Sequence, residues 1–163
     1  MAELPASAQQ IIDLHQLIEH DEGGWFRETY RSEETINCPD RTGGERPLIT
    51  TIHYMLEASR PYALLHRNKS DIVHFYEGGG VFRYLTFSPG DKFEEFFLGP
   101  GYQRQLIVAG GTWKATELID GDWGLVGEAV SPGFDYRDRE LAQRSQIIDL
   151  HPELRNLPLE FWV

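Results

Sequence analysis

The sequence predicts an all-β domain, a barrel or sandwich of short strands, on three observations. About nine apolar, strand-like runs are separated by turn residues, a helical pattern lies near each end of the chain, and strands do not alternate with helices. No linker-like stretch and no internal repeat divides the 163 residues. One domain covering residues 1–163 is therefore expected.

The first element is expected to be an amphipathic helix over about residues 7–19. Ser7 is suited to be its N-cap, and apolar residues then recur at helical spacing. A turn at 21–24 leads into a strand over 25–31, which is rich in aromatic residues. Alternation along this strand places Phe26, Glu28 and Tyr30 on one face and Trp25, Arg27, Thr29 and Arg31 on the other.

The rest of the chain is expected to form strands up to the last thirty residues. A loop is expected at 37–47, and strands at 48–56, 62–67, 71–77, 81–87, 92–98, 105–108, 112–118 and 124–130. One or two helices are expected within 137–150. The apolar tail that follows should pack on its own barrel or on a partner subunit; it contains Leu154, Leu157, Leu159, Phe161 and Trp162.

The composition excludes several classes of partner. A net charge of −11 opposes binding to nucleic-acid backbones and to anionic membranes. No apolar run approaches the roughly 18–20 residues that span a bilayer, and the N-terminus lacks the pattern of a signal peptide. The single cysteine, Cys38, excludes an intrachain disulfide, and a cytoplasmic location is expected. Phosphate-loop, nucleophile-elbow and structural-zinc patterns are all lacking.

Two histidines on neighbouring predicted strands mark the candidate site. His66 and His74 stand on either side of a short polar turn. Because a histidine in a strand is costly to bury without a partner, the pair indicates either a site or two core residues bonded to carbonyls. The ordinary histidine pKa of about 6.5 suits acid–base chemistry.

Two further interpretations concern residues near this pair. An iron or manganese site could combine both histidines with Asp71 and with His53 or Glu128. His53 alone is more typical of a core residue. Glu28, between two aromatic residues, is either an edge-strand carboxylate paired with an arginine or a ligand contact.

Three segments of the chain resemble one small family of the cupin superfamily whose function is unknown. They are residues 22–31, 66–78 and 132–135, and the resemblance extends from about Ile12 to about Leu141. It implies a double-stranded β-helix, the cupin jelly-roll barrel, with short helices at the two ends. Proteins of this superfamily are usually homodimers, so a homodimer is expected.

The chain departs from the motifs of metal-binding cupins, which resemble one another in three histidines and a glutamate. His66 matches the first histidine, but Asn68 stands at the second and apolar residues stand near the glutamate position. Lys114 stands where the second motif has its histidine. Since an ammonium group repels a cation, the comparison implies neither a metal nor another cofactor.

Metal-free deoxythymidine-diphosphate-sugar epimerases of the same superfamily are more similar. Phe26 and Glu28 match their nucleotide-binding segment, although Gly23 replaces its arginine. Their base histidine stands at a corner similar to Leu65–His66. No tyrosine of this chain is matched to their acid.

The resemblance implies a metal-independent isomerase or epimerase acting on a sugar phosphate or nucleotide sugar, with nucleoside diphosphate binding. His66 would be the base, and His74 and Lys114 would stabilise the enolate oxygen. The expected ligand-binding residues are Phe26, Arg27, Glu28, Arg67, Tyr76, Trp113 and Glu128. Positive charge for a phosphate would come from Arg27, Arg31, Arg67 and Lys69. The alternatives are a non-catalytic ligand-binding cupin, of sensor or storage type, and a metal-dependent cupin enzyme.

Overall fold

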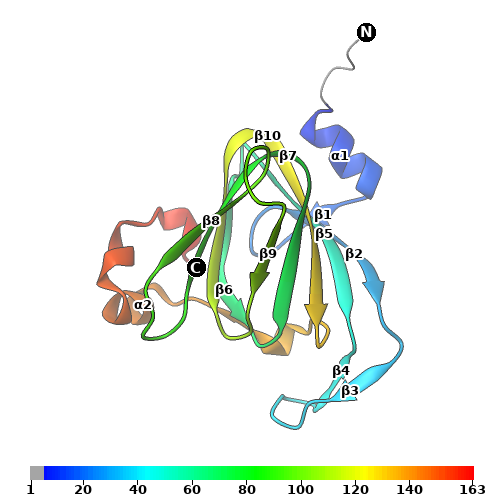
Figure 1. The fold of residues 1–163 in the computed structure, drawn as a ribbon, viewed down its shortest axis with the longest axis vertical. Helices are drawn as coiled ribbons and strands as arrows, with labels where there is room; N and C mark the ends of the chain where they lie inside the picture. The colour runs from blue at the N-terminus through cyan, green and yellow to red at the C-terminus, as the bar shows by residue number, and fades with distance from the viewer. Residues whose placement is uncertain (1–5) are drawn as a thin grey trace.

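The computed structural model describes residues 6–163 and shows an antiparallel sheet curled into a barrel, with short helical segments at both ends of the chain (Figure 1). The predicted all-β class is confirmed. The helical segments are α1 (Ala8–His15), η1 (Tyr136–Asp138), α2 (Arg144–Leu150), η2 (Pro152–Asn156) and η3 (Leu159–Phe161). Neither α-helix in residues 6–163 has the length and apolar character needed to cross a membrane.

Two long strands form the centre of the barrel. The strands are β1 (Ile18–Glu19), β2 (Trp25–Arg31), β3 (Thr35–Asn37), β4 (Glu45–Pro47), β5 (Thr50–Glu57), β6 (Tyr62–Asn68), β7 (Asp71–Phe87), β8 (Glu94–Leu98), β9 (Gln105–Val108), β10 (Trp113–Ser131) and β11 (Arg139–Leu141). The main sheet has the order β1-β2-β5-β10-β6-β11, and β7 pairs with β8, β9 and β10. Strands β3 and β4 pair with each other as a separate hairpin, which projects from the barrel (Figure 1).

In two places, a pair of strands that the sequence predicts as separate forms one long strand. The runs 71–77 and 81–87 form β7, and the runs 112–118 and 124–130 belong to β10. The sequence predicts a break between the first two of these runs, at residues 78–80, but the strand continues through Gly80. Because glycine has no side chain, β10 can pass close to the backbone here. A Cβ atom on Gly80 would lie 1.7 Å from the carbonyl oxygen of Asp120. The pairing of β7 with β10 shifts register here, so the two halves of each strand are joined by an irregularity instead of a loop.

The terminal helices are shorter than the sequence predicted. Ser7 caps α1 in a capping box with Gln10, as its sequence indicated. The helix ends at His15 because Gln16 adopts the left-handed conformation with φ 52°. The following residues 18–19 pair with β2. Similarly, residues 139–141 extend the sheet before α2 begins.

The apolar C-terminal tail packs on its own barrel. Phe161 is fully buried, and Leu154 and Trp162 are buried with it against Leu65 and Leu85 of the sheet. Figure 1 shows this segment folded back beside the barrel. The tail thus contributes a core at one side of the sheet, while a second apolar cluster around Phe82 and other barrel residues fills the interior.

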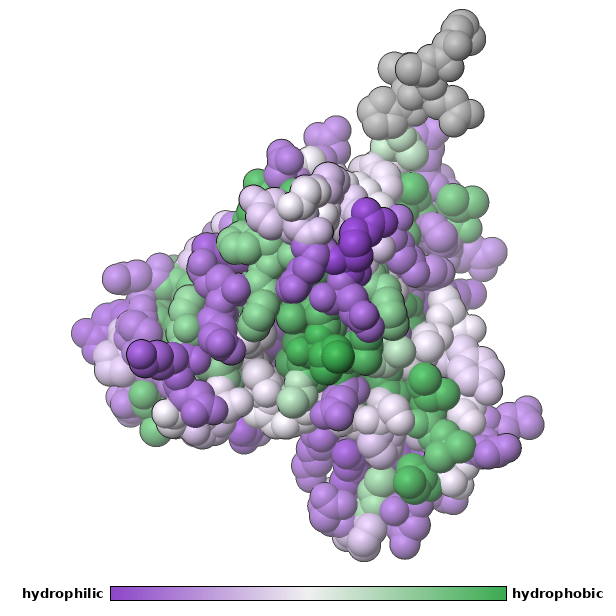
Figure 2. Space-filling view, in the orientation of Figure 1, coloured by the Kyte–Doolittle hydropathy of each residue, from purple (hydrophilic) through white to green (hydrophobic). Residues whose placement is uncertain are grey.

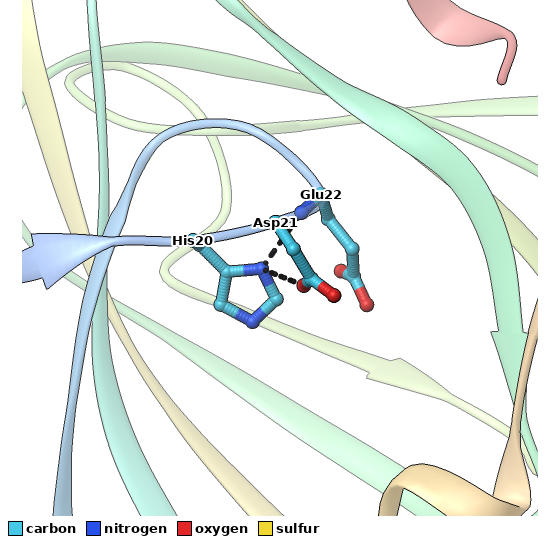
Figure 3. Close-up of side chains that lie close together, drawn as sticks. All are labelled: His20, Asp21 and Glu22. Carbon is cyan, nitrogen blue, oxygen red and sulfur yellow. Dashed lines mark hydrogen bonds and ion pairs between the residues drawn. The ribbon is translucent and has the colours of Figure 1, made fainter.

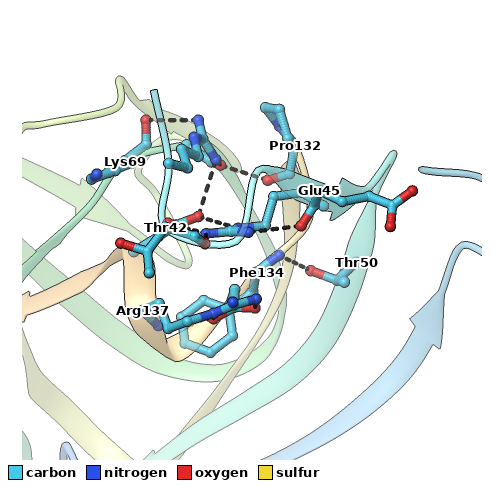
Figure 4. A network of polar contacts seen from close by, with 12 residues as sticks. Thr42, Glu45, Thr50, Lys69, Pro132, Phe134 and Arg137 are labelled. Atoms are coloured by element: carbon cyan, nitrogen blue, oxygen red, sulfur yellow. Dashed lines mark hydrogen bonds and ion pairs between the residues drawn. The ribbon is translucent and has the colours of Figure 1, made fainter. Parts of the chain in front are cut away.

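A buried polar network attaches the hairpin β3–β4 to the barrel (Figure 4). Arg46 of β4 is fully buried and donates at 2.8 Å to each oxygen of Asp138. Arg41, in the hairpin loop, donates to Asp138 at 3.2 Å and to Ser70 at 2.7 Å. The hydrogen bonds from Arg46 lower the pKa of Asp138, although burial opposes them. The carboxylate therefore stays ionised and holds the hairpin in place.

Candidate functional site

A cavity of about 470 Å³ opens into the barrel. Its volume lies in the range typical of small-molecule sites. It is walled by β2, β5, β6, β7 and β10 and by the segment that follows β10. Its polar lining residues are His20, Glu22, Glu28, Arg31, Thr50, His66, Asn68, Lys114, Thr116, Glu128 and Asp135. Its apolar and aromatic lining residues are Phe26, Ile52, Tyr54, Ala63, Ile72, Val130, Phe134 and Tyr136.

His66 lies in the wall of this cavity with a defined tautomer. Its Nδ1 atom lies 2.7 Å from the carbonyl oxygen of Leu64, which can only accept, so Nδ1 carries the proton. Burial lowers the pKa of His66; nearby Glu22 opposes this shift and Lys114 adds to it. The imidazole is therefore neutral at pH 7, and the free lone pair is on Nε2.

Glu22 stands next to that lone pair. Its Oε2 lies 3.3 Å from Nε2 of His66, and both side chains are buried. Its Oε1 accepts a hydrogen bond from Arg139 at 3.0 Å, and the same guanidinium bonds both oxygens of Asp21. A carboxylate at this place favours the protonated form of His66 once a proton arrives. Glu22 and His66 are thus arranged as a proton-accepting pair.

A second buried cluster connects β7 and β10 beside this pair. The Nζ atom of Lys114 lies 3.2 Å from Nε2 of His74, and Nδ1 of His74 lies 3.1 Å from Oε1 of Glu128. The sheet register makes this possible, because Glu128 stands opposite His74 and Lys114 stands opposite His66. Burial and Lys114 lower the pKa of His74, with Glu128 opposing them. Burial alone would raise the pKa of Glu128, but Lys114 and His74 outweigh it and the pKa falls.

A β-bulge decides which residues of β2 face the cavity. The register shifts between Glu28 and Tyr30, so Arg31 joins Phe26 and Glu28 in the lining, and Tyr30 is 54% exposed. Simple alternation had placed Arg31 on the opposite face and Tyr30 with Glu28. Arg31 donates to both oxygens of Glu28 at 2.8 and 2.9 Å and to the carbonyl of Phe134 at 3.3 Å. The bulge thus links β2 to the segment at the cavity mouth.

The structure brings six of the ten predicted site residues together. Phe26, Glu28, His66, Lys114 and Glu128 line the cavity, and fully buried His74 stands behind Lys114 and Glu128.

The other four predicted site residues do not line this cavity. Arg27 is exposed and donates to Gln16. Arg67 lies over the ring of Trp113, which is buried in the C-terminal core cluster. The hydroxyl of Tyr76 donates to the carbonyl of Gly79. Strand alternation turns Arg27, Arg67 and Trp113 away from the cavity, because each is next in sequence to a residue that faces it. Tyr76 shares a face with Ile72 and His74 but packs on the apolar cluster around Phe82.

Several lining residues were not expected from the sequence. Glu22 stands in the predicted turn at 21–24, His20 just before it, and Tyr54 in the predicted strand at 48–56. The segment 132–135 was part of the family resemblance, and it places Phe134 and Asp135 at the cavity. Glu22 also lies in a segment of that resemblance, residues 22–31, whereas His20 and Tyr54 had no signal in the sequence.

The donor atoms of the barrel do not fit a divalent cation. Nε2 of His74 already has the ammonium of Lys114 as its partner, and Lys114 stands opposite His66 in the sheet, where its charge would repel a cation at Nε2 of His66. Asp71 is exposed and accepts from the Gly110 amide, and His53 lies 2.8 Å from Glu77. The sequence-based metal combination therefore does not converge.

A second group of possible ligand atoms lies next to the cavity (Figure 3). His20, Asp21 and Glu22 offer ligand atoms within 4.8 Å of one another. His20 Nδ1 accepts from the Glu22 amide at 3.0 Å, and Arg139 donates to both carboxylates. Because the Arg139 guanidinium already binds both carboxylates and offsets one of their two negative charges, this group also fits a cation poorly.

Comparisons with known proteins identify the fold. A family model described as "Cupin superfamily (DUF985)" matches residues 9–142. The uncharacterized protein YML079W of Saccharomyces cerevisiae is 35% identical over 154 residues, which cover 85% of this chain and 76% of that protein. A hypothetical protein from Leishmania major has a TM-score of 0.86 at 25% identity, over 96% of this chain and 99% of the other.

A more distant structure supports the architecture. Oxalate decarboxylase from Bacillus subtilis matches with a TM-score of 0.57 at 14% identity, over 86% of this chain and 36% of that one, which concerns the fold alone. None of these matches is a deoxythymidine-diphosphate-sugar epimerase, so that resemblance stays a prediction. The predicted jelly-roll barrel is confirmed, and the chain belongs to the cupin superfamily, in the family described as DUF985.

Proposed function

We propose that the barrel cavity binds a sugar phosphate or nucleotide sugar and isomerises or epimerises it without a metal. The observation that carries this proposal is the position of His66. Its neutral imidazole lines the cavity with Nδ1 held by a backbone carbonyl, Nε2 next to the Glu22 carboxylate, and the Lys114 ammonium on the adjacent strand. This is the arrangement of a general base beside a stabiliser of negative charge.

The proposed reaction is a proton transfer next to a carbonyl group. Nε2 of His66 takes the proton from the carbon, and the electron pair of the C–H bond moves to form an enolate oxygen. The Lys114 ammonium stabilises this oxygen, and the Glu22 carboxylate stabilises the imidazolium. Return of a proton to carbon completes the isomerisation and needs no oxidant or reductant.

The buried cluster behind Lys114 supports its role. His74 accepts from the ammonium through Nε2, and it lies against Glu128 through Nδ1. The flexible lysine side chain is therefore held in one place before the ligand arrives. Such preorganisation is what makes a charged group effective in a semi-enclosed site.

The mouth of the cavity supports a ligand with a ring and a phosphate. Phe26, Phe134 and Tyr136 line it and offer faces for a sugar or base. Arg31 also lines the cavity, and it donates to the carbonyl of Phe134. Its guanidinium would bind a phosphate group of the ligand after giving up its hydrogen bonds to Glu28.

We propose further that the protein is a cytoplasmic homodimer. The exposed apolar side chains near the projecting hairpin support this assembly. Tyr30 is 54% exposed, Ile36 is 42% exposed and Leu48 is 38% exposed. Figure 2 shows apolar surface gathered over this part of the molecule.

Solvent deuterium exchange tests the proposed chemistry directly. Nucleoside diphosphates, nucleotide sugars and hexose phosphates are first screened by thermal shift, and each binder is then incubated in D2O and followed by NMR. We expect deuterium to enter the C–H bond next to a carbonyl. His66→Gln should slow this exchange by about 10²–10⁴-fold while binding persists, because a general base contributes about that factor.

His53→Gln is the matched control. His53 also stands on a strand and also contacts a glutamate, Glu77, but it is not part of the cavity. This variant should exchange deuterium at the wild-type rate. Unchanged exchange in His66→Gln would contradict the assignment of the base.

The second candidate function is a non-catalytic binding module. The hydroxyl of Tyr54, a possible second acid in the cavity, already donates to the carbonyl of Gly23 at 2.8 Å. Saturable binding of a ligand with no deuterium exchange in the wild-type protein would favour this function over the isomerase.

A further inference from the structure

A basic crevice lies on the outside of the barrel, and Asn68 belongs both to its lining and to that of the cavity. It has a volume of about 380 Å³ and lies where β6, β11, η1 and the turn before β10 meet. It is lined by Arg67, Asn68, Lys69, Gly111, Arg137, Asp138, Arg139 and Glu140. Four of the fifteen lysines and arginines of this acidic chain therefore line one small feature.

The carboxylates around the crevice do not cancel all of its positive charge. Arg139 is held by Asp21 and Glu22, and Arg137 is held by Asp135. Of the two carboxylates in the lining, Asp138 is already held by Arg46 and Arg41 from behind. Glu140 pairs with Arg67 at 2.7 Å at the surface. No carboxylate of residues 6–163 lies within 4.0 Å of the ammonium of Lys69, which is exposed. One complete positive charge is thus available to a ligand.

The guanidinium groups also keep donors for a ligand. Arg67 uses Nε and Nη2 for Glu140, and Arg137 uses Nε and Nη2 for Asp135. Neither of these pairs uses the Nη1 group of the arginine, so each Nη1 group can donate to a ligand. Asn68, which is 9% exposed, adds a buried carboxamide whose Oδ1 lacks a hydrogen-bond partner. Turning the carboxamide over would present its NH2 group in the same place.

We infer that this crevice is a binding site for a small polyvalent anion of the phosphate type. Lys69 and the outer faces of Arg67 and Arg137 hold the anion, and Asn68 supplies a neutral polar contact. Paired guanidinium groups suit the oxygens of such an anion. The inference does not depend on the chemistry proposed for the barrel cavity.

Calorimetric titration with inorganic pyrophosphate tests this site. The wild-type protein should show saturable binding that weakens when salt is raised from about 50 mM to about 500 mM, because partly exposed charges are screened. Lys69→Gln should weaken binding by about three- to fivefold, the effect of losing one partly exposed charge pair. Lys69 makes no side-chain hydrogen bond or ion pair among the described residues, so the variant should fold normally.

Two further variants decide where the anion binds. Lys92→Gln removes an equally exposed lysine elsewhere and should leave the affinity unchanged, as should His66→Gln in the cavity. Absence of saturable binding, equal affinities of Lys69→Gln and wild type, or loss of binding in His66→Gln alone would each overturn the proposal.

A titration with glucose 6-phosphate separates two sources of the anion. If glucose 6-phosphate binds, and if both Lys69→Gln and Phe26→Ala weaken its binding, the phosphate group belongs to a ligand that also enters the barrel. If pyrophosphate binds but glucose 6-phosphate does not, and if Lys69→Gln alone weakens the binding of pyrophosphate, the crevice binds a free anion. Both results support the crevice, and deuterium exchange at the cavity is measured separately.

Discussion

The buried ionisable side chains of the barrel control one another's charge. Lys114 is 3% exposed and His74 is fully buried, yet each has a polar neighbour within 3.2 Å. A buried charge is tolerated only when it is paired, since desolvation costs several kcal/mol per ion. Lys114, His74 and Glu128 therefore depend on one another, and removal of one of them leaves the buried charge of another without a partner.

Replacement of Lys114 tests this dependence. Lys114→Met leaves Nε2 of His74 without its donor and removes the positive charge near the Glu128 carboxylate, and we expect the free energy of unfolding to fall by about 3 kcal/mol, the usual cost of removing one member of a buried charged cluster. Urea denaturation at pH 7 measures the change. Lys92→Met, at an exposed site, is the control and should stay within about 0.5 kcal/mol. A similar small change in Lys114→Met would contradict the buried pairing.

The pH dependence of stability tests the two histidines. The pKa of His66 and that of His74 are both lowered in the folded state, chiefly by burial. Below the ordinary pKa of about 6.5 the unfolded chain binds these protons and the folded chain does not, so stability falls as the pH falls.

The expected slope is up to about 1.4 kcal/mol per pH unit for each histidine, over the window below pH 6.5. Glu128 adds a further loss below about pH 4.5, because its pKa is also lowered and its contribution exists only above that range. Urea denaturation at pH 7.5, 6.5 and 5.5 measures the slope, and His66→Gln should make it shallower. Constant stability across this range would show that these histidines are not buried as neutral groups.

At the scale of elements, the hairpin β3–β4 depends on one arginine. Its strands pair only with each other within the described chain, and Arg46 ties them to Asp138, the last residue of η1. The same region orders the cavity mouth, because the Gly133 amide donates to the carbonyl of Pro47 and the Phe134 amide donates to Thr50. The hairpin therefore supports one wall of the site.

Arg46→Met should destabilise the protein by about 3–5 kcal/mol, because Asp138 would lose its buried bidentate partner. Hydrogen exchange should also become faster in residues 35–47 and 131–136. Arg60→Met is the control, since Arg60 pairs with Glu19 at the surface and such pairs contribute about 0–1 kcal/mol. Equal effects of the two variants would refute the role of the buried network.

At the scale of the whole molecule, the C-terminal tail completes the core. Phe161 has no exposed surface and lies edge-to-face with Tyr62 of β6 at a ring distance of 5.0 Å. The barrel is thus built from residues at both ends of the chain. This arrangement does not require a second subunit to cover the tail.

Phe161→Ala should lower the free energy of unfolding by about 3–5 kcal/mol, the range for loss of a buried phenylalanine. Denaturation midpoints measured at several protein concentrations test whether the packing partner is the same chain. The loss should be independent of concentration, and Leu159→Ala, at a position 71% exposed, should have little effect. A loss that disappears at high concentration would instead place Phe161 in a subunit interface.

Much of the fold was predictable because local patterns report burial and turns. Alternating runs located most strands, Ser7 located the start of α1, and His66 stood out as a polar residue in a strand. Element boundaries were less predictable. Gly78–Gly80 resemble a turn in the sequence, but whether the strand continues depends on the close approach of Asp120 from a distant strand.

The site was predictable only in part, for the same reason. The sequence indicated Phe26, Glu28, His66, His74, Lys114 and Glu128 as site residues, and the structure brings them together. The bulge that turns Arg31 into the cavity arises from the pairing of β2 with β5, which no local pattern encodes. Trp113 was expected to bind the ligand, but it does not line the cavity. Its ring is buried against the C-terminal tail.

The sequence by itself determined the all-β class, the positions of most strands and the residues that resist burial without a partner. These properties depend on side-chain chemistry and short-range periodicity. The tertiary structure alone decided that Glu22 stands beside His66, that Lys114 meets His74, and that six basic residues gather around Asp138 in and behind the crevice. The reason is that these contacts join segments far apart in the chain, and their geometry follows from strand register and curvature.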